Sequence, residues 1–338
     1  MLAAGAAEPA AAQRLQGRVV SAADSVPVVA ALVVLIDGSG SRIARTPTGA
    51  GGSFFLQAPT PGRYVVAVLR IGQRPWRSAA LELEAGAVRR VTFSLPDDPI
   101  ILDAIAVEAR SGCRTSPAEG STIGTLLEEA DRALTVTRLA MEQRGMSSYV
   151  AVLYRRTLSP SLETIDSTLD VATNLSWPIR SVSPEALAAH GFVRTDEATP
   201  DRPLGGVTYF GLDATVLLSP WFLSTHCFGV SEGAGPDSDA VVVTFRPEGG
   251  NRPDIQGRLV VARTTLELRR IEWDYVRLPR WVTTEGAGGA LTLARLSTGV
   301  YLPSQWWLRG PVPVVNPRRE PVGLWGWSES GGRMVPNR

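Results

Sequence analysis

The sequence predicts a mainly β protein in which a small sandwich precedes one long helix and a curved antiparallel sheet. The chain has 338 residues, enough for two domains with separate cores. Gly and Pro are frequent, at 33 and 25 residues, and they separate many short runs rich in Val and Leu. Runs of this kind between turn residues are typical of β-strands. In one stretch, residues 120–145, apolar side chains recur at helical spacing.

Composition argues against two classes of partner. The net charge is +1, from 34 basic and 33 acidic residues, so no excess charge would attract the chain to nucleic acid or anionic lipid. All 34 basic residues are arginine. No run approaches the roughly 18 apolar residues that a membrane-spanning helix needs.

Residues 1–13, "MLAAGAAEPAAAQ", are rich in alanine and end in a small-x-small pattern before Gln13. They resemble the last part of a secretory signal with its cleavage site, although the positive n-region and the long apolar core are missing. The alternative is a disordered tail. We favour export, since the chain also holds two cysteines, and expect a periplasmic or cell-surface protein.

Residues 14–98 are predicted to form the sandwich. Strands are expected at residues 17–22, 32–37, 51–59, 61–72 and 88–96, with a loop at 38–42. Alternation supports this, because every second residue from Tyr64 to Val68 is apolar and would lie on one face. Gly52 and Gly62 would serve turns that need a positive φ.

Leu15 to Pro96 resembles the carboxypeptidase regulatory-like domain, a transthyretin-like β-sandwich. The resemblance rests on "GRVVSAADSVPVVAALVVLID" followed by "TGAGGSFFLQAPTPGRYVVAVLRIG". It implies an accessory module, of the kind that often leads outer-membrane receptors and surface enzymes. The peptidase itself would need a histidine and a glutamate close together for zinc, and neither His190 nor His226 has a glutamate three residues on. We therefore expect no metal and no cofactor.

Residues 99–146 are predicted to be a linker strand and a helix. "LDAIAV" resembles the segment that follows this sandwich in TonB-dependent receptors, which suggests a receptor as a partner; the alternative is a plain linker. Ser121 could cap the helix and Gly145 would end it. Its apolar stripe is Ile123, Leu126, Leu127, Ala130 and Leu134, and the charged residues expected to face solvent are Glu128, Glu129, Asp131 and Arg132.

Residues 147–338 are predicted to form the larger antiparallel sheet. Strands are expected at residues 147–158, 169–175, 206–218, 240–247, 255–262, 266–278, 289–303 and 321–330, with a short helix at 184–191. "IQGRLVVARTTLELRRIEWDY" predicts a hairpin with Thr264 and Thr265 near its turn. This part resembles the periplasmic lipoprotein carriers, whose fold is a curved half-barrel around a helix. Together with the sandwich, the chain also resembles uncharacterised bacterial proteins, which implies placement in the envelope.

"LSTHCFGV" places His226 beside Cys227. On a strand, adjacent side chains point to opposite faces, so this pair could not act as base and nucleophile. The spacing of Cys113, Cys227, His190 and His226 favours no zinc site. We predict a Cys113–Cys227 disulfide, which would stabilise by about 4 to 5 kcal/mol in the chain-entropy model. Two free buried thiols and a reactive thiol are the alternatives.

Eight of the nine tryptophans follow residue 176. Each could fill the core, but flat aromatic side chains also hold sugar rings and acyl chains. The predicted ligand-facing set is Trp281, Trp306, Trp307, Trp325 and Trp327.

The sequence thus favours a non-catalytic envelope protein that binds a glycan or a lipid, or that acts as an adaptor. One alternative is a partner of a TonB-dependent receptor, docked through a sheet edge near "LDAIAV". The other is a hydrolase, for which the candidate acids are Asp166, Asp170, Asp213, Asp254 and Glu272, with no motif to link them.

Overall fold

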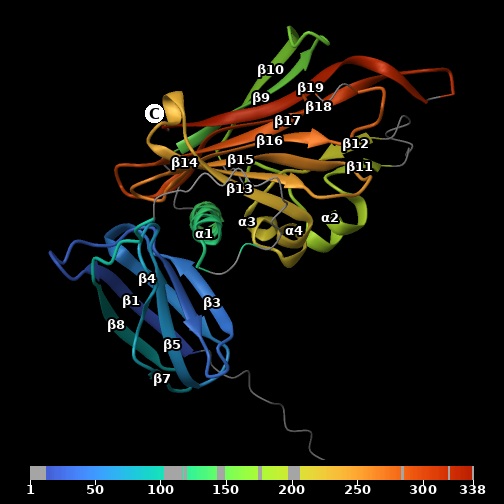
Figure 1. Ribbon diagram of the computed structural model, residues 1–338. Helices are drawn as coiled ribbons and strands as arrows, with labels where there is room; N and C mark the ends of the chain where they lie inside the picture. Colours follow the sequence, from blue (N-terminus) through green and yellow to red (C-terminus); the bar gives the residue numbers. More distant parts are fainter. Residues whose placement is uncertain are drawn as a thin grey trace, which may run out of the picture. The chain divides into compact units, whose positions relative to one another are not determined.

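The computed structural model describes residues 13–102, 117, 120–142, 149–173, 177–196, 206–282, 285–318 and 320–336. The chain forms two compact units (Figure 1). The first comprises Met1–Ile100 and Leu296–Val300, and the second comprises Ile101–Arg295 and Tyr301–Arg338. Both are built mainly of antiparallel strands, so the predicted fold class is confirmed. The alanine-rich start, most of "LDAIAV" and Cys113 lie outside the described residues.

The first unit is a sandwich of two sheets. In one sheet a central strand pairs antiparallel on one side and parallel on the other: β4 (Ser53–Ala58), β1 (Gln13–Ser21), β8 (Val88–Leu95). The other sheet has the order β3 (Arg42–Pro47), β2 (Leu32–Ile36), β5 (Gly62–Leu69), β6 (Trp76–Arg77), with β7 (Leu81–Leu83) also paired to β5. The alternating apolar side chains of these strands form its core, including Leu15, Val33, Phe54, Val66 and Phe93.

Two features of this unit bear on the sequence predictions. Gly52 has φ of 70°, as predicted, and a Cβ there would lie 2.2 Å from the Val19 carbonyl oxygen, so no other residue fits. The sequence predicts only a loop at residues 38–42, since "RIARTP" has little apolar alternation. Strand β3 begins within that loop, at Arg42. Its backbone pairing with β2 stabilises a strand that its own sequence does not favour.

The second unit is a nine-stranded antiparallel sheet. Its order is β10 (Thr164–Ala172), β9 (Tyr149–Leu158), β19 (Pro321–Pro336), β18 (Tyr301–Val315), β17 (Gly288–Arg295), β16 (Leu268–Val276), β15 (Asp254–Ala262), β14 (Ala240–Pro247), β13 (His226–Glu232). Strands β13 to β19 follow one another as a meander, and the earlier β9–β10 hairpin joins at β19. The predicted hairpin of β15 and β16 is present. A separate hairpin pairs β11 (Val193–Asp196) with β12 (Gly206–Tyr209).

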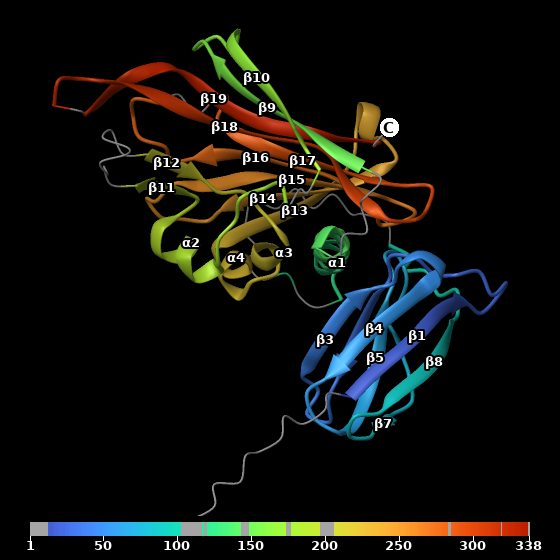
Figure 2. The same cartoon turned by 180° about the vertical axis from the view of Figure 1, so that it is seen from behind.

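Helices cover one face of this sheet, which we call the inner face (Figures 1 and 2). The long helix α1 (Thr122–Glu142) lies against β18 and β13 to β16 and contacts α3 (Ala214–Leu217); the other helices are α2 (Pro184–His190) and α4 (Pro220–Thr225). The Ser121 hydroxyl accepts a hydrogen bond from the Gly124 N–H at 3.1 Å, which confirms the predicted cap. Among the described residues, none of the helices combines the length and apolarity needed to cross a bilayer.

Three sequence predictions for this unit were wrong. Glu129 and Arg132 do not face solvent, since both are buried and form an ion pair with each other at 2.5 Å. Residues 206–218 do not continue as a strand, because the Asp213 carboxylate accepts the N–H groups of Thr215 and Val216 and begins α3. Residues 289–303 are not one strand: they form most of β17, a turn and the start of β18, and Gly299 adopts φ of 87° at the turn.

A buried carboxylate ties β9, β19 and β18 together on the outer face of the sheet. Arg309 donates two hydrogen bonds to one oxygen of Glu329, at 2.8 and 2.6 Å, and Arg156 lies 3.6 Å from the other oxygen. Each guanidinium also stacks on an aromatic ring, Arg309 on Trp307 and Arg156 on Tyr154. Glu329 is 4% exposed, so its charge depends on these partners.

We therefore predict that Glu329→Gln lowers the free energy of unfolding by about 3 kcal/mol, because it leaves the Arg309 guanidinium without its carboxylate in a partly buried position. Arg156→Gln is the matched control. The Arg156 side chain is 43% exposed, so its loss should cost about 1 kcal/mol or less. Urea unfolding of both variants measures the difference, and equal losses would contradict this account of the network.

Candidate functional site

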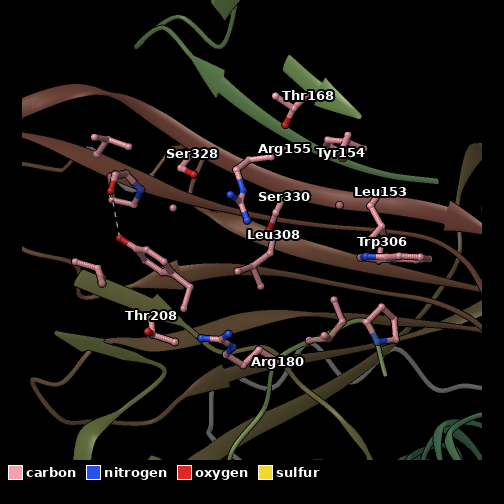
Figure 3. Close-up of a pocket in the computed structure, with 18 of the residues that line it drawn as sticks. Leu153, Tyr154, Arg155, Thr168, Arg180, Thr208, Trp306, Leu308, Ser328 and Ser330 are labelled. Carbon is pink, nitrogen blue, oxygen red and sulfur yellow. Dashed lines mark hydrogen bonds between the residues drawn. The ribbon is translucent and has the colours of Figure 1, made fainter. Parts of the chain in front are cut away.

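A groove of about 910 Å³ lies on the inner face of the second unit, between the sheet and two covering segments (Figure 3). Strands β9, β18, β19 and β10 form one wall. Residues 177–180 and strand β12 form the other. Its volume falls within the range of about 300 to 1,000 Å³ that is typical of small-molecule sites.

The register of the strands decides which side chains face the groove. Leu308 of β18 lies opposite Ser330 of β19, which lies opposite Arg155 of β9, and Arg155 lies opposite Thr168 of β10. Residues opposite one another in an antiparallel pair share a face, so all four project to the inner side. The row of side chains crosses four strands, which belong to two hairpins that are distant in sequence.

The covering segments are fixed by Tyr209 and Gly211. The Tyr209 hydroxyl donates to the Pro311 carbonyl at 3.4 Å, and burial raises its pKa above the ordinary tyrosine value. A Cβ on Gly310 would lie 2.2 Å from the Tyr209 ring, so only glycine allows β12 to approach this closely. The Gly211 N–H donates to the Arg180 carbonyl at 2.9 Å and joins the two segments.

The groove has a mixed lining of apolar, hydroxyl-bearing and charged side chains. Its apolar lining is Leu153, Trp177, Ile179, Val207, Trp306, Leu308, Pro311, Val312 and Pro313. Arg155 extends into it from β9 and Arg180 from the covering side (Figure 3). Neither guanidinium forms an ion pair with any residue that the structure describes, and Asp170 is the acidic residue of the lining. The lining therefore has an excess of positive charge.

The five predicted tryptophans do not come together. Trp306 lines the groove and Trp307 lies on the outer face under Arg309. Trp327 is buried and its indole N–H donates to the Pro160 carbonyl at 3.3 Å. Trp325 is 49% exposed, because it occupies a bulge between the paired residues Leu324 and Gly326. Trp281 is half-buried in the turn after β16.

Sequence reasoning missed Trp177, Tyr209 and both arginines of the groove. Arg155 and Tyr209 lie on strands β9 and β12, and Trp177 and Arg180 lie on a connecting segment; none of the four belongs to a sequence motif. They meet only because β9 and β12 approach β18 from distant parts of the chain. No local pattern could have found them.

His226 and Cys227 lie on β13, opposite Pro247 and Arg246, so they point to opposite faces as predicted. His226 is fully buried and stacks on Phe222, with ring centroids 3.9 Å apart. Its Nδ1 lies 3.2 Å from the Phe222 carbonyl oxygen, and its Nε2 lies 3.3 Å from Asp254 without hydrogen-bond geometry. This packing is that of a core residue.

The other candidate residues of the sequence also lie apart. His190 is exposed at the end of α2. Asp166 and Asp170 are exposed on β10, Asp213 caps α3, Asp254 begins β15 beside His226, and Glu272 pairs with Arg258 and Arg270. Within the described part of the chain, no three His, Cys, Asp or Glu side chains are arranged to hold a metal ion.

Comparison with known proteins identifies the first unit. Residues 14–96 match the family model described as the carboxypeptidase regulatory-like domain, as the sequence predicts. The search of curated proteins returned no match.

Among solved structures, the minor pilin GBS52 of Streptococcus agalactiae is 15% identical with a TM-score of 0.22, over 28% of this chain and 48% of the pilin. The chain thus spans about half of that pilin. A DUF3823 family protein of Bacteroides ovatus is 8% identical with a TM-score of 0.19, over 70% and 91% of the two chains. A protein of unknown function from Bacteroides fragilis is 11% identical with a TM-score of 0.20, over 98% and 99%. Likeness at this level carries no argument about function.

The Cys113–Cys227 disulfide stays a prediction, since Cys113 lies outside the described residues. Cys227 is 5% exposed on β13. We expect the unfolded, non-reduced chain to react with no thiol reagent, and to take up two equivalents after reduction. Peptide mapping should find the two cysteines cross-linked, whereas two reactive thiols before reduction would contradict the prediction.

Ionisation of Tyr154 should lower the free energy of unfolding at alkaline pH. Burial, and then the charge of Glu329, raise its pKa from 10.0 to about 12. A phenol with a raised folded pKa contributes stability that is complete below about pH 10 and is lost as pH rises through about 12. Urea unfolding should therefore show a steeper loss in this window for the native chain than for Tyr154→Phe. Parallel curves would show that Tyr154 titrates normally.

Proposed function

We propose that this protein is a non-catalytic binding module of the cell envelope, and that the groove of its second unit holds an acidic amphiphile such as a fatty acid or a lysophospholipid. The observation that carries the proposal is the lining of the groove. Both walls carry apolar side chains among the hydroxyl groups of Thr168, Thr208, Ser328 and Ser330. The two arginines that face the groove have no carboxylate partner among the described residues.

The lining favours an amphiphile over a glycan. A sugar-binding platform presents the flat face of an aromatic ring to solvent. Here Trp306 is only 4% exposed, and the one strongly exposed tryptophan of the predicted set, Trp325, lies outside the groove. Aliphatic side chains and prolines make up most of the apolar wall, and these suit an acyl chain.

The arginines favour an acidic head group. A guanidinium holds a carboxylate or phosphate through two parallel hydrogen bonds. Arg155 and Arg180 lie on different walls, so a head group between them could be held from both sides. Asp170 would disfavour a second negative charge near β10.

Placement in the envelope is supported by other features. The carboxypeptidase regulatory-like domain is an accessory module whose relatives often precede outer-membrane receptors and surface enzymes. The alanine-rich start resembles the end of a secretory signal, and a predicted disulfide would suit an oxidising compartment.

The first test is native mass spectrometry of the chain isolated from the envelope fraction, followed by titration of the purified chain with oleate and with lysophosphatidylglycerol. We expect a bound mass of lipid size and saturable binding. A bound oligosaccharide would overturn the ligand class, and a bare chain that binds neither lipid would overturn the proposal.

Ser330→Trp should abolish lipid binding. Ser330 is exposed on the groove wall, so an indole there fills the groove without entering the core. Gln305→Trp is the matched control, because Gln305 is exposed on the outer face of the adjacent strand β18. Equal binding by both variants would place the ligand elsewhere.

Arg155→Gln combined with Arg180→Gln should weaken oleate binding about tenfold or more, because charge-assisted hydrogen bonds are lost. The same variant should bind monoolein, which has the same chain and no charge, as the native protein does. A similar loss for both ligands would contradict the role given to the arginines.

A further inference from the structure

A second surface of the second unit lies at the open edge of its sheet. Strand β10 is the last strand of the nine, and among the strands that the structure describes it pairs with β9 alone (Figures 1 and 2). All its side chains from Thr164 to Val171 are exposed. Three of them are apolar, with Ile165 at 58%, Leu169 at 75% and Val171 at 61% exposed.

Edge strands usually carry features that prevent pairing with another chain, such as lysines, prolines or a bulge. Strand β10 contains neither a proline nor any cationic residue. Its one irregularity lies between Thr164 and Asp166, so residues 166–172 form a regular, uncovered edge. This edge has Leu169 and Val171 exposed on one face and Asp166 and Asp170 on the other, so a strand of complementary charge and hydrophobicity could join it.

One hydrogen bond shows which backbone groups of β10 point toward the open edge. The Val171 N–H donates to the Asp170 carboxylate at 2.8 Å, so it points away from β9. Because antiparallel strands alternate with a period of two, the N–H and C=O groups of Ser167 and Leu169 point the same way. These three residues would form the ladder with an added strand.

The charges of the edge favour a basic partner. Asp166 and Asp170 lie on the inner face, and Leu169 and Val171 on the outer face. An added strand would therefore be best stabilised by basic side chains on its inner face and apolar ones on its outer face. A second copy of this chain fits poorly, because pairing the whole of β10 with its copy would place Asp166 opposite Asp170.

We propose that β10 is a docking edge for an extended segment of another protein that alternates basic and apolar residues. The segment adds to the sheet as a tenth strand. Its backbone pairs with Ser167, Leu169 and Val171, and its basic side chains lie beside Asp166 and Asp170.

The test uses the full chain and a fluorescein-labelled peptide of the length of β10 in which arginine and valine alternate. Fluorescence anisotropy should show saturable binding. A peptide of the same composition with its arginines and valines in separate blocks should bind at least about tenfold more weakly, since it cannot match both faces of the edge. Equal affinity would show attraction by charge alone and would overturn the proposal.

Leu169→Pro should abolish binding, because it removes an N–H that faces the partner and leaves the ladder with β9 intact. Leu169→Thr is its control, since it keeps the N–H and should retain most of the binding. The double variant Asp166→Asn, Asp170→Asn should weaken binding about threefold to tenfold, with less dependence on salt. Native affinity in Leu169→Pro would overturn the proposal.

Hydrogen exchange on the native chain gives a reading that does not depend on the folding of any variant. Bound peptide should slow exchange at Ser167, Leu169 and Val171, and should leave Thr168 and Asp170, which face β9, nearly unchanged. Slowed exchange elsewhere would overturn the site. A dimer in light scattering that the peptide cannot dissociate would assign the edge to a second copy instead.

Discussion

The antiparallel pairing of β9 with β19 is the contact on which both the groove and the open edge depend. Ten residue pairs join the two strands, from Tyr149 with Pro336 to Leu158 with Trp327. This brings the start of the second unit beside its end, at the entropic cost of closing a long loop. Without it, β9 and β10 would not reach the sheet, and the groove would lose the wall that carries Arg155. The buried Glu329 holds this pairing in register, because a shift of one residue would turn its carboxylate to the inner face, away from Arg309 and Arg156.

The fold followed from the sequence where its signals are local. The alternating strands of the sandwich, the hairpin of β15 and β16 and the helix capped by Ser121 were all predicted. Local signals failed where a few residues decide the structure. Asp213 begins a short helix within a run of strand-forming residues, and the polar strand β3 depends on its pairing with β2. Glu129 and Arg132 were expected at the surface, because a helical pattern cannot show that two charged residues will be buried as a pair.

The site was less accessible to prediction than the fold. The sequence predicts Trp306 as a residue of the site. It does not predict Arg155, Arg180, Trp177 or Tyr209. Their roles arise from the register across four strands and from the close approach that Gly310 permits. In a regular strand, Trp325 and Trp327 would lie on one face, because they are two residues apart. The bulge at Trp325 removes this arrangement, since one extra residue changes the face of all that follow.

Strand β10 belongs to both surfaces, and this links them physically. Its inner face gives Thr168 and Asp170 to the groove, while its backbone groups at Ser167, Leu169 and Val171 point to the open edge. A strand added at that edge would extend the wall of the groove and place basic side chains beside Asp170, the one acidic residue of the lining. Neutralising the charge of Asp170 would raise the affinity of the groove for an acidic ligand. By linkage, the ligand would strengthen the docking of the strand by the same factor. The two proposed interactions, of an acidic ligand in the groove and of a strand at the edge, would therefore strengthen each other through a single exposed strand.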